Sequence, residues 1–228
     1  MLIGGFQKMT LLDYPGKIAC IIFTHGCNFR CPYCHNAALV CESCDAVSEQ
    51  EIFDYLKKRK GILEGVCVSG GEPCLQKDLL GFLRKVKELG YSVKLDTNGS
   101  CPQVLRQAID QGLCDYVAMD IKNAPDKYAL SADVDVDVES IRESVALLLE
   151  GRVEYEFRTT VTRELHKKED MKKIGELIAG AKRYFLQTFT DSGNLIGEGM
   201  SAYTPDEMRA LADEIRDLVP SVSVRGID

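Results

Sequence analysis

Two features are missing from this chain: a long hydrophobic run and an excess of basic residues. The longest apolar run lies near residues 18–23. It is too short to cross a bilayer, so we expect no membrane segment. The net charge is −7 and the pI is about 5.1. This acidity argues against a general nucleic-acid surface, because such surfaces attract phosphate groups through clustered positive charge.

A signal-peptide pattern and an interdomain linker are also missing. The chain contains ten cysteines, and a secreted chain would risk mispairing so many thiols, so we expect a reducing, cytoplasmic environment. A length of 228 residues is enough for one domain with a substantial core. We therefore expect a single domain over residues 1–228.

Cysteine is concentrated in the loop at residues 26–36. Cys27, Cys31 and Cys34 follow the spacing C-x3-C-x2-C, which lets three thiolates converge on one inorganic centre. A closed structural zinc site and an ordinary iron–sulfur cluster both take four protein ligands. Three cysteines on a 4Fe-4S cluster leave one iron open to bind a reactant. This loop therefore predicts a catalytic centre.

Other interpretations of the loop stay open. A structural zinc site could recruit His35 or the pair Cys41 and Cys44, because Cys-x2-Cys pairs often bind zinc. The pair at residues 41–44 could equally form a redox couple or have no chemical role. A disulfide framework is disfavoured, since the three cysteines of the loop cannot all pair with one another.

From residue 18 onward, short apolar runs that predict strands alternate with amphipathic stretches that predict helices. The expected strands are 18–24, 66–69, 91–96, 116–121, 153–161 and 184–189, with a short one at 222–224. The expected helices begin with capping boxes at 48 and 204, and elsewhere cover 77–89, 102–112, 138–150 and 168–179. Parallel strands need crossovers, so this alternation implies an α/β fold, either an open doubly wound sheet or a partial barrel.

Polar motifs follow the expected strands, where the loops of such folds form the active-site face. Taken singly, each motif is typical of a tight turn or a solvated ion pair. Together they gather polar groups at one end of one sheet, which favours a binding site. The motifs are Gly70-Gly71-Glu72-Pro73, Asp96-Thr97-Asn98-Gly99, Asp120-Ile121-Lys122, and Arg158 with Thr160 on the fifth strand.

The cysteine motif, with an aromatic residue before its third cysteine, and the later Gly-Gly-Glu-Pro resemble the radical S-adenosylmethionine (SAM) superfamily. Within it, the chain is similar to glycyl-radical enzyme activating proteins through Asp13-Tyr14-Pro15-Gly16, Cys34-His35-Asn36 and the motifs after the third and fourth strands. The greatest similarity is to the activating protein of anaerobic ribonucleoside-triphosphate reductase. The resemblance implies a partial (βα)6 barrel of parallel strands.

The resemblance also implies a function. A 4Fe-4S cluster on the three cysteines would bind the amino and carboxylate groups of SAM at its open iron. One electron from a donor such as flavodoxin or ferredoxin would cleave SAM to methionine and a 5′-deoxyadenosyl radical. This radical would take a hydrogen atom from a glycine of a large partner, the anaerobic reductase.

The resemblance further assigns roles to residues after the strands. Gly70, Gly71 and Glu72 would meet the amino group of SAM, Arg158 its carboxylate, Lys122 the carboxylate or ribose, and Tyr33 the adenine. Asp96, Thr97 and Asp120 would bind a monovalent cation beside the carboxylate, for which oxygen ligands are suited.

Two other functions compete with this one. A small-molecule radical enzyme similar to 7-carboxy-7-deazaguanine synthase is disfavoured, because the third cysteine is followed by His-Asn and no extra substrate-binding domain is evident. A non-enzymatic metal-binding module would need a fourth ligand. Of the remaining residues, we expect His166 on the surface, Cys20, Cys67 and Cys114 in the core, and Gln187 within reach of the substrate.

Overall fold

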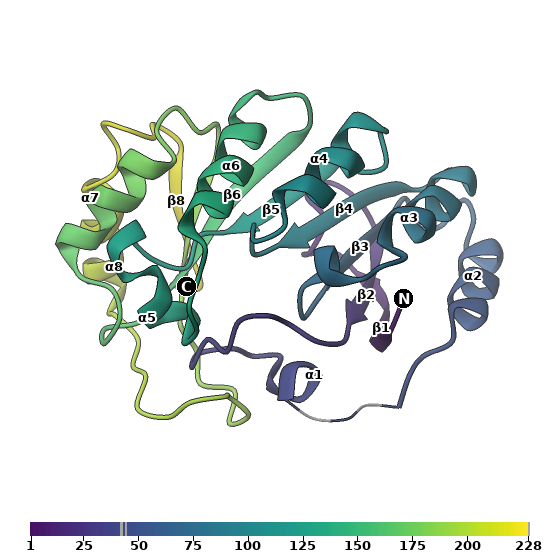
Figure 1. Cartoon of the computed structure of the whole chain (residues 1–228), viewed down its shortest axis with the longest axis horizontal. Helices are drawn as coiled ribbons and strands as arrows, with labels where there is room; N and C mark the ends of the chain where they lie inside the picture. The colour runs from purple at the N-terminus through teal and green to yellow at the C-terminus, as the bar shows by residue number, and fades with distance from the viewer. Residues whose placement is uncertain (42, 44, 228) are drawn as a thin grey trace.

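The computed structural model describes residues 1–41, 43 and 45–227. In it, an eight-stranded sheet follows the order of the sequence from β1 to β8 (Figure 1). β1 runs antiparallel to β2, and each later strand runs parallel to the one before it. The strands are β1 (Ile3–Thr10), β2 (Ala19–Thr24), β3 (Gly65–Gly70), β4 (Ser92–Thr97), β5 (Tyr116–Asp120), β6 (Glu154–Val161), β7 (Tyr184–Thr188) and β8 (Val222–Arg225).

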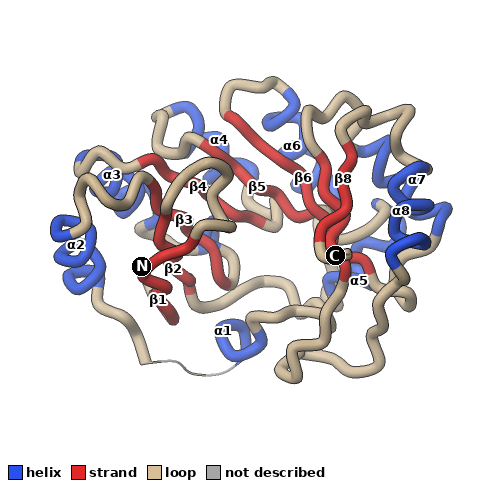
Figure 2. The backbone as a smooth tube through the Cα atoms, turned by 180° about the vertical axis from the view of Figure 1, so that it is seen from behind, coloured by secondary structure: helices blue, strands red, loops and turns tan. Residues whose placement is uncertain are grey.

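Helices connect the parallel strands, and most of them cover the outer side of the curved sheet, whereas the short α1 lies apart from that layer (Figures 1 and 2). Two short 3-10 turns, η1 (Pro73–Leu75) and η2 (Pro125–Lys127), follow β3 and β5. The α-helices are α1 (Ala37–Cys41), α2 (Glu49–Lys58), α3 (Leu79–Glu88), α4 (Pro102–Asp110), α5 (Tyr128–Ala132), α6 (Val138–Leu149), α7 (Lys168–Leu177) and α8 (Pro205–Asp213).

The sheet is an incomplete barrel. β1 and β8 end the strand order, and within the described residues they do not pair with each other. Figure 2 shows the sheet curving between these two edges, with the helices outside it. The expected α/β fold of parallel units is therefore confirmed, and the partial barrel is the form it takes.

The strand β1 was not predicted. Its sequence, IGGFQKMT, contains two glycines and shows no apolar alternation, because most of its side chains are half-buried or exposed at the edge of the sheet. β1 forms a strand because its backbone pairs with the hydrophobic strand β2, and such backbone pairing leaves no pattern in the side chains of β1. The short helices α1 and α5 were also missed, since a single helical turn carries too little periodicity to detect.

Alternating residues of the strands divide the interior into two parts. One face of the strands contributes Val66, Val68, Val93 and Leu95 to the large core under the helices. The opposite face lines the inside of the barrel. There a small cluster of Tyr14, Ala19, Ile21, Cys67 and Tyr116 forms a separate apolar floor near the starts of the strands.

The loop between β1 and β2 completes this floor. It places the Tyr14 ring inside the barrel, 6.1 Å from the Tyr116 ring. A Cβ atom on Gly65 would lie 2.7 Å from the Tyr14 ring, so the start of β3 has to be glycine for the tyrosine to fit. This apolar floor lies near the starts of the strands, whereas the polar groups inside the barrel lie where the strands end.

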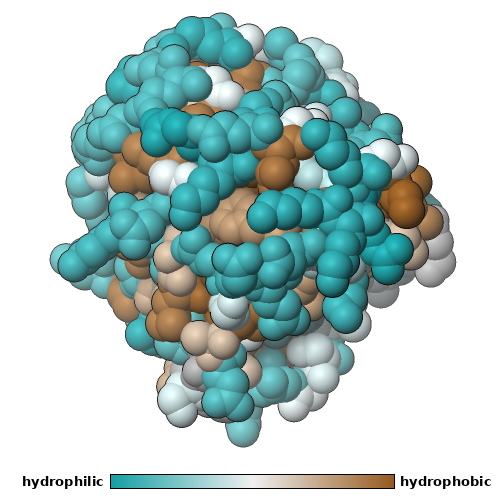
Figure 3. Space-filling view, turned by 90° about the vertical axis from the view of Figure 1, so that its right-hand side faces the viewer, coloured by the Kyte–Doolittle hydropathy of each residue, from teal (hydrophilic) through white to brown (hydrophobic). Residues whose placement is uncertain are grey.

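The surface agrees with the composition. The face over α2, shown in Figure 3, is mostly hydrophilic with separate small hydrophobic patches. In the part of the chain that the structure describes, no helix has both the length and the apolar character needed to cross a bilayer. Cys20, Cys67 and Cys114 lie in the core, as expected.

Candidate active site

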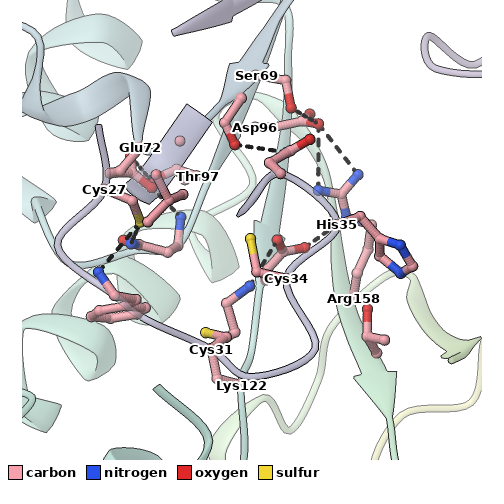
Figure 4. A pocket seen from close by; sticks show the side chains of 18 of the residues that line it. Cys27, Cys31, Cys34, His35, Ser69, Glu72, Asp96, Thr97, Lys122 and Arg158 are labelled. Carbon is pink, nitrogen blue, oxygen red and sulfur yellow. Dashed lines mark hydrogen bonds and ion pairs between the residues drawn. The ribbon is translucent and has the colours of Figure 1, made fainter. Parts of the chain in front are cut away.

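A cavity of about 390 Å³ lies inside the barrel, where the parallel strands end (Figure 4). Loops after β2, β3, β4 and β5 contribute to its lining, and so do side chains of β6 and β7. The structure brings all the residues expected at the site to this one cavity: Cys27, Cys31, Tyr33, Cys34, Gly70, Gly71, Glu72, Asp96, Thr97, Asp120, Lys122 and Arg158. Gln187, which we expect within reach of the substrate, lines the cavity as well.

The cysteine loop and the glycine motif are held against each other through their backbones. Gly71 donates its N–H to Thr24 over 2.9 Å, and Glu72 donates its N–H to the carbonyl oxygen of Gly26 over 2.9 Å. A Cβ atom on Gly71 would lie only 2.0 Å from that same Gly26 oxygen. Position 71 therefore has to be glycine for the two loops to meet.

The donor set fits an iron–sulfur cluster. Cys27, Cys31 and Cys34 carry free thiols and border one cavity, into which all three project from the same loop (Figure 4). Burial raises the pKa of the Cys27 thiol to about 11 and also raises that of Cys31. Thiolates form in such surroundings only beside a positive charge, which iron ions supply.

Glu72 is a buried clamp between two loops. Its Oε1 accepts hydrogen bonds from the N–H of Cys74 (2.9 Å) and the hydroxyl of Thr97 (2.8 Å), and its Oε2 accepts one from the N–H of Asn98 (2.6 Å). Each carboxylate oxygen has two lone pairs, so Oε2 keeps the capacity to accept from a ligand amino group. The clamp fixes the loop after β4 relative to the loop after β3.

Asn98 extends this clamp to the cysteine loop. Its side-chain amide donates to Asn28 Oδ1 over 2.9 Å and contacts Cys27 Sγ at 3.8 Å. The backbone N–H of Phe29 also points at Cys27 Sγ, at 3.3 Å. Such bonds stabilise a thiolate and tune a cluster. We had assigned no role to Asn98, although it lies in the polar motif after the third expected strand.

A chain of alternating charges crosses the wall of the cavity. Lys94 pairs with Asp96, Asp96 with Arg158 (3.4 Å), Arg158 with Asp120 (2.9 Å) and Asp120 with Lys122 (3.2 Å). Burial opposes the charge on Asp120, but Arg158 and Lys122 outweigh it and lower the pKa of this carboxyl to about 2. Figure 4 shows Asp96, Arg158 and Lys122 around the space bordered by the cysteines.

His166 lies in the interior, so the prediction of a surface position was wrong. Its Nδ1 accepts the N–H of Thr162 (3.2 Å), which leaves the proton on Nε2 to donate to the carbonyl oxygen of Lys122 (2.8 Å). Its ring lies 6.3 Å from the ring of Tyr33. Burial lowers the pKa of His166, so the neutral ring links the cysteine loop to the Lys122 segment.

Asp13 and Tyr33 are two further residues that line the cavity. Asp13, from the loop between β1 and β2, lines the cavity, although its motif served only for the family resemblance and predicts no role for it. Tyr33 is buried, and within the described residues its hydroxyl has no hydrogen-bond partner.

Cys41 is exposed at the end of α1. Its expected partner Cys44 lies outside the described residues, so the pair is not tested.

Comparison with known proteins identifies the family. The family model of the radical SAM superfamily matches residues 21–179. This chain belongs to the radical SAM superfamily. A provisionally assigned glycyl-radical enzyme activating enzyme of Methanocaldococcus jannaschii is 32% identical over 237 residues, which cover 100% of this chain and 97% of that protein. The pyruvate formate-lyase-activating enzyme of Listeria monocytogenes is 34% identical over 139 residues, 55% of each chain.

Solved structures agree on the fold. A domain of a pyruvate-formate lyase-activating enzyme from Bacteroides vulgatus has a TM-score of 0.58 and 16% identity, covering 71% of this chain and 99% of that one. SuiB of Streptococcus suis has a TM-score of 0.67 and 15% identity, covering 90% of this chain and 48% of that one. The protein is thus a radical SAM enzyme of the glycyl-radical activating family, which uses a 4Fe-4S cluster and SAM.

Proposed function

We propose that this radical SAM enzyme installs a glycyl radical on anaerobic ribonucleoside-triphosphate reductase. One electron would come from a donor such as flavodoxin or ferredoxin. We further propose that residues 1–228 form one domain and that the protein works in the cytoplasm, where its ten thiols stay reduced. When bound, the cluster and SAM supply the one-electron chemistry and the radical that removes hydrogen from glycine.

Different residues of the cavity would bind the cluster and the different parts of SAM. Cys27, Cys31 and Cys34 would hold the cluster. Gly70, Gly71 and Glu72 would receive the amino group of SAM, for which a carboxylate and backbone carbonyls are suitable acceptors. Arg158 would pair with its carboxylate, Lys122 would contact the carboxylate or ribose, and Tyr33 would lie beside the adenine. Asp96, Thr97 and Asp120 would form the wall beside the carboxylate.

The observation that carries the proposal is the position of this cavity in an incomplete barrel. All the charged and thiol groups lie at the strand ends of a sheet whose edge strands are unpaired with each other in the described part. A loop of a protein substrate can therefore approach a site that a closed barrel would surround. Water would then be excluded by the partner itself, which protects a reactive radical.

The choice of partner rests on the cysteine content and the sequence motifs. The chain is 32% identical to an activating enzyme of Methanocaldococcus jannaschii that has no named partner. Between Cys34 and Val66 the chain has two cysteines, which is too few for the inserted ferredoxin-like region of some other activating proteins. Together with the sequence motifs, this cysteine content favours the anaerobic reductase.

Electron paramagnetic resonance tests the proposal directly. The anaerobically reconstituted and reduced enzyme is mixed with SAM and the anaerobic reductase, and in parallel with pyruvate formate-lyase. We expect a glycyl-radical doublet on the reductase that is lost with Cys31→Ala and retained with the matched control Cys114→Ala, whose thiol lies in the core. A doublet on pyruvate formate-lyase alone would reassign the partner. Cleavage of SAM with no doublet on either protein would refute the activase role.

A further inference from the structure

Lys94 is more deeply buried than the other two cationic side chains near the cavity, Lys122 and Arg158. Its side chain is only 3% exposed and extends from β4 toward Asp96, two residues later on the same face of the strand. Lysine is almost never fully buried unless it is paired. Here the partner is the Asp96 carboxylate, so the ammonium group is fixed against the wall of the cavity.

The groups expected to bind a monovalent cation are already engaged. Asp96 Oδ1 accepts from Lys94, and Asp96 Oδ2 accepts from Ser69 (3.0 Å) and contacts Arg158 (3.4 Å). Asp120 Oδ1 accepts from Arg158 (2.9 Å) and Oδ2 from Lys122 (3.2 Å). Every carboxylate oxygen of this pair therefore has a cationic side chain beside it.

Thr97 is turned away from this pair. Its hydroxyl donates to Glu72 Oε1 over 2.8 Å and accepts the N–H of Gly99 over 3.1 Å. The three expected ligands line one cavity, but their oxygens are engaged by other groups and are not gathered around one point where a hard cation could bind them. Their arrangement does not fit the cation that the resemblance implied.

The charge of the Asp96 and Asp120 pair is balanced without a bound ion. Lys94, Lys122 and Arg158 face the two carboxylates of Asp96 and Asp120, which leaves one positive charge for an incoming carboxylate. The nearby buried Glu156 is separately paired with Arg225, at 3.1 Å. Asp13, also in the lining, accepts from the Thr10 hydroxyl.

We propose that Lys94 takes the place of a monovalent cation, so that this protein binds SAM without one. The inference rests on the placement of SAM proposed above. Lys94 is a positioning residue: it holds Asp96, and Asp96 in turn holds Arg158 toward the substrate carboxylate. A fixed ammonium group makes the site independent of the sodium and potassium of its surroundings, because it cannot exchange with solvent.

Equilibrium dialysis of SAM against the reconstituted enzyme tests this proposal without the partner protein, so its result does not depend on whether the reductase is the substrate. Dissociation constants are measured in choline chloride, sodium chloride and potassium chloride at equal ionic strength. For the wild type we expect the same value in all three salts. For Lys94→Met in choline we expect affinity to fall about tenfold or more, since a buried charge has lost its partner.

The decisive result is the salt dependence of the variant. Sodium or potassium should restore much of the affinity of Lys94→Met, Lys94→Arg should behave as the wild type does, and the control Lys87→Met should show no effect, because Lys87 pairs with Asp115 outside the cavity. A several-fold loss of wild-type affinity in choline would overturn the proposal, even if Lys94→Met failed to fold. A folded Lys94→Met that binds equally well in every salt would overturn it too.

Discussion

The clamp formed by Glu72 predicts a large effect from a change of one atom. In Glu72→Gln, one carboxylate oxygen becomes an NH₂ group. If the NH₂ replaces Oε2, it faces the backbone N–H of Asn98, which now has no acceptor. If the amide is turned over, the N–H of Cys74 loses its acceptor instead. Either orientation sets two donors against each other in a site where Glu72 is 1% exposed.

The cost follows from these contacts. The variant loses one hydrogen bond to a charged group and leaves a buried donor unpaired, so the free energy of unfolding should fall by roughly 2–4 kcal/mol. Thr97→Val removes a hydroxyl that donates to the same carboxylate and accepts the N–H of Gly99, so it should cost roughly 1–3 kcal/mol. Glu64→Gln is the matched control, because Glu64 also accepts a backbone N–H, from Ile18 over 3.0 Å, but at the surface. Its effect should stay within about 0.5 kcal/mol.

Urea unfolding of the cluster-free protein, kept reduced, measures all three variants on one scale. Removing the cluster separates the strength of the clamp from any loss of metal. The reasoning would be refuted if Glu72→Gln were no less stable than Glu64→Gln, since the buried carboxylate would then contribute nothing to joining the loops.

Three further changes test other parts of the structure. Gly71→Ala should lower stability by roughly 2–4 kcal/mol and reduce iron content on reconstitution, since its methyl group would meet the Gly26 oxygen; normal iron content would contradict the close approach. Arg225→Met should cost roughly 1–3 kcal/mol by thermal unfolding, because buried Glu156 loses its ion-pair partner and keeps the hydrogen bond from the Tyr116 hydroxyl, and Arg209→Met at an exposed ion pair serves as control. The pKa of His166 is lowered in the folded chain, so the unfolded chain binds the extra proton first. Stability should therefore fall as pH drops below about 6.5, and His166→Gln should lose that part of the pH dependence.

The sequence was sufficient to predict where the site lies, because the order of strands and motifs along the chain determines which loops meet. In a sheet of parallel strands, every strand ends at the same edge, so Cys27, Glu72, Asp96 and Asp120 had to converge wherever the strands curved. Small errors in the ends of strands did not matter, since each motif follows its strand directly.

Burial inside the barrel was not predictable in the same way. The alternation in β4 places Lys94 and Asp96 on one face, but that pattern is the same whether the face meets solvent or the inside of a barrel. His166 was misjudged for a related reason: apart from Leu165 its neighbours in the sequence are polar, and the segments that help to bury it, with Tyr33 and Lys122, are distant in the sequence.

The floor built on Tyr14 has a consequence for the order of events in a catalytic cycle. It fills the inside of the barrel near the starts of the strands with apolar side chains, among them Tyr14 from the loop before β2 and Tyr116 from β5. Small molecules then exchange through the same side on which a protein substrate is proposed to dock. SAM would have to load before the partner arrives, and spent cofactor would leave only after the partner departs. Each activation would thus need one binding event between the two proteins, and the rate of turnover would depend on the lifetime of their complex.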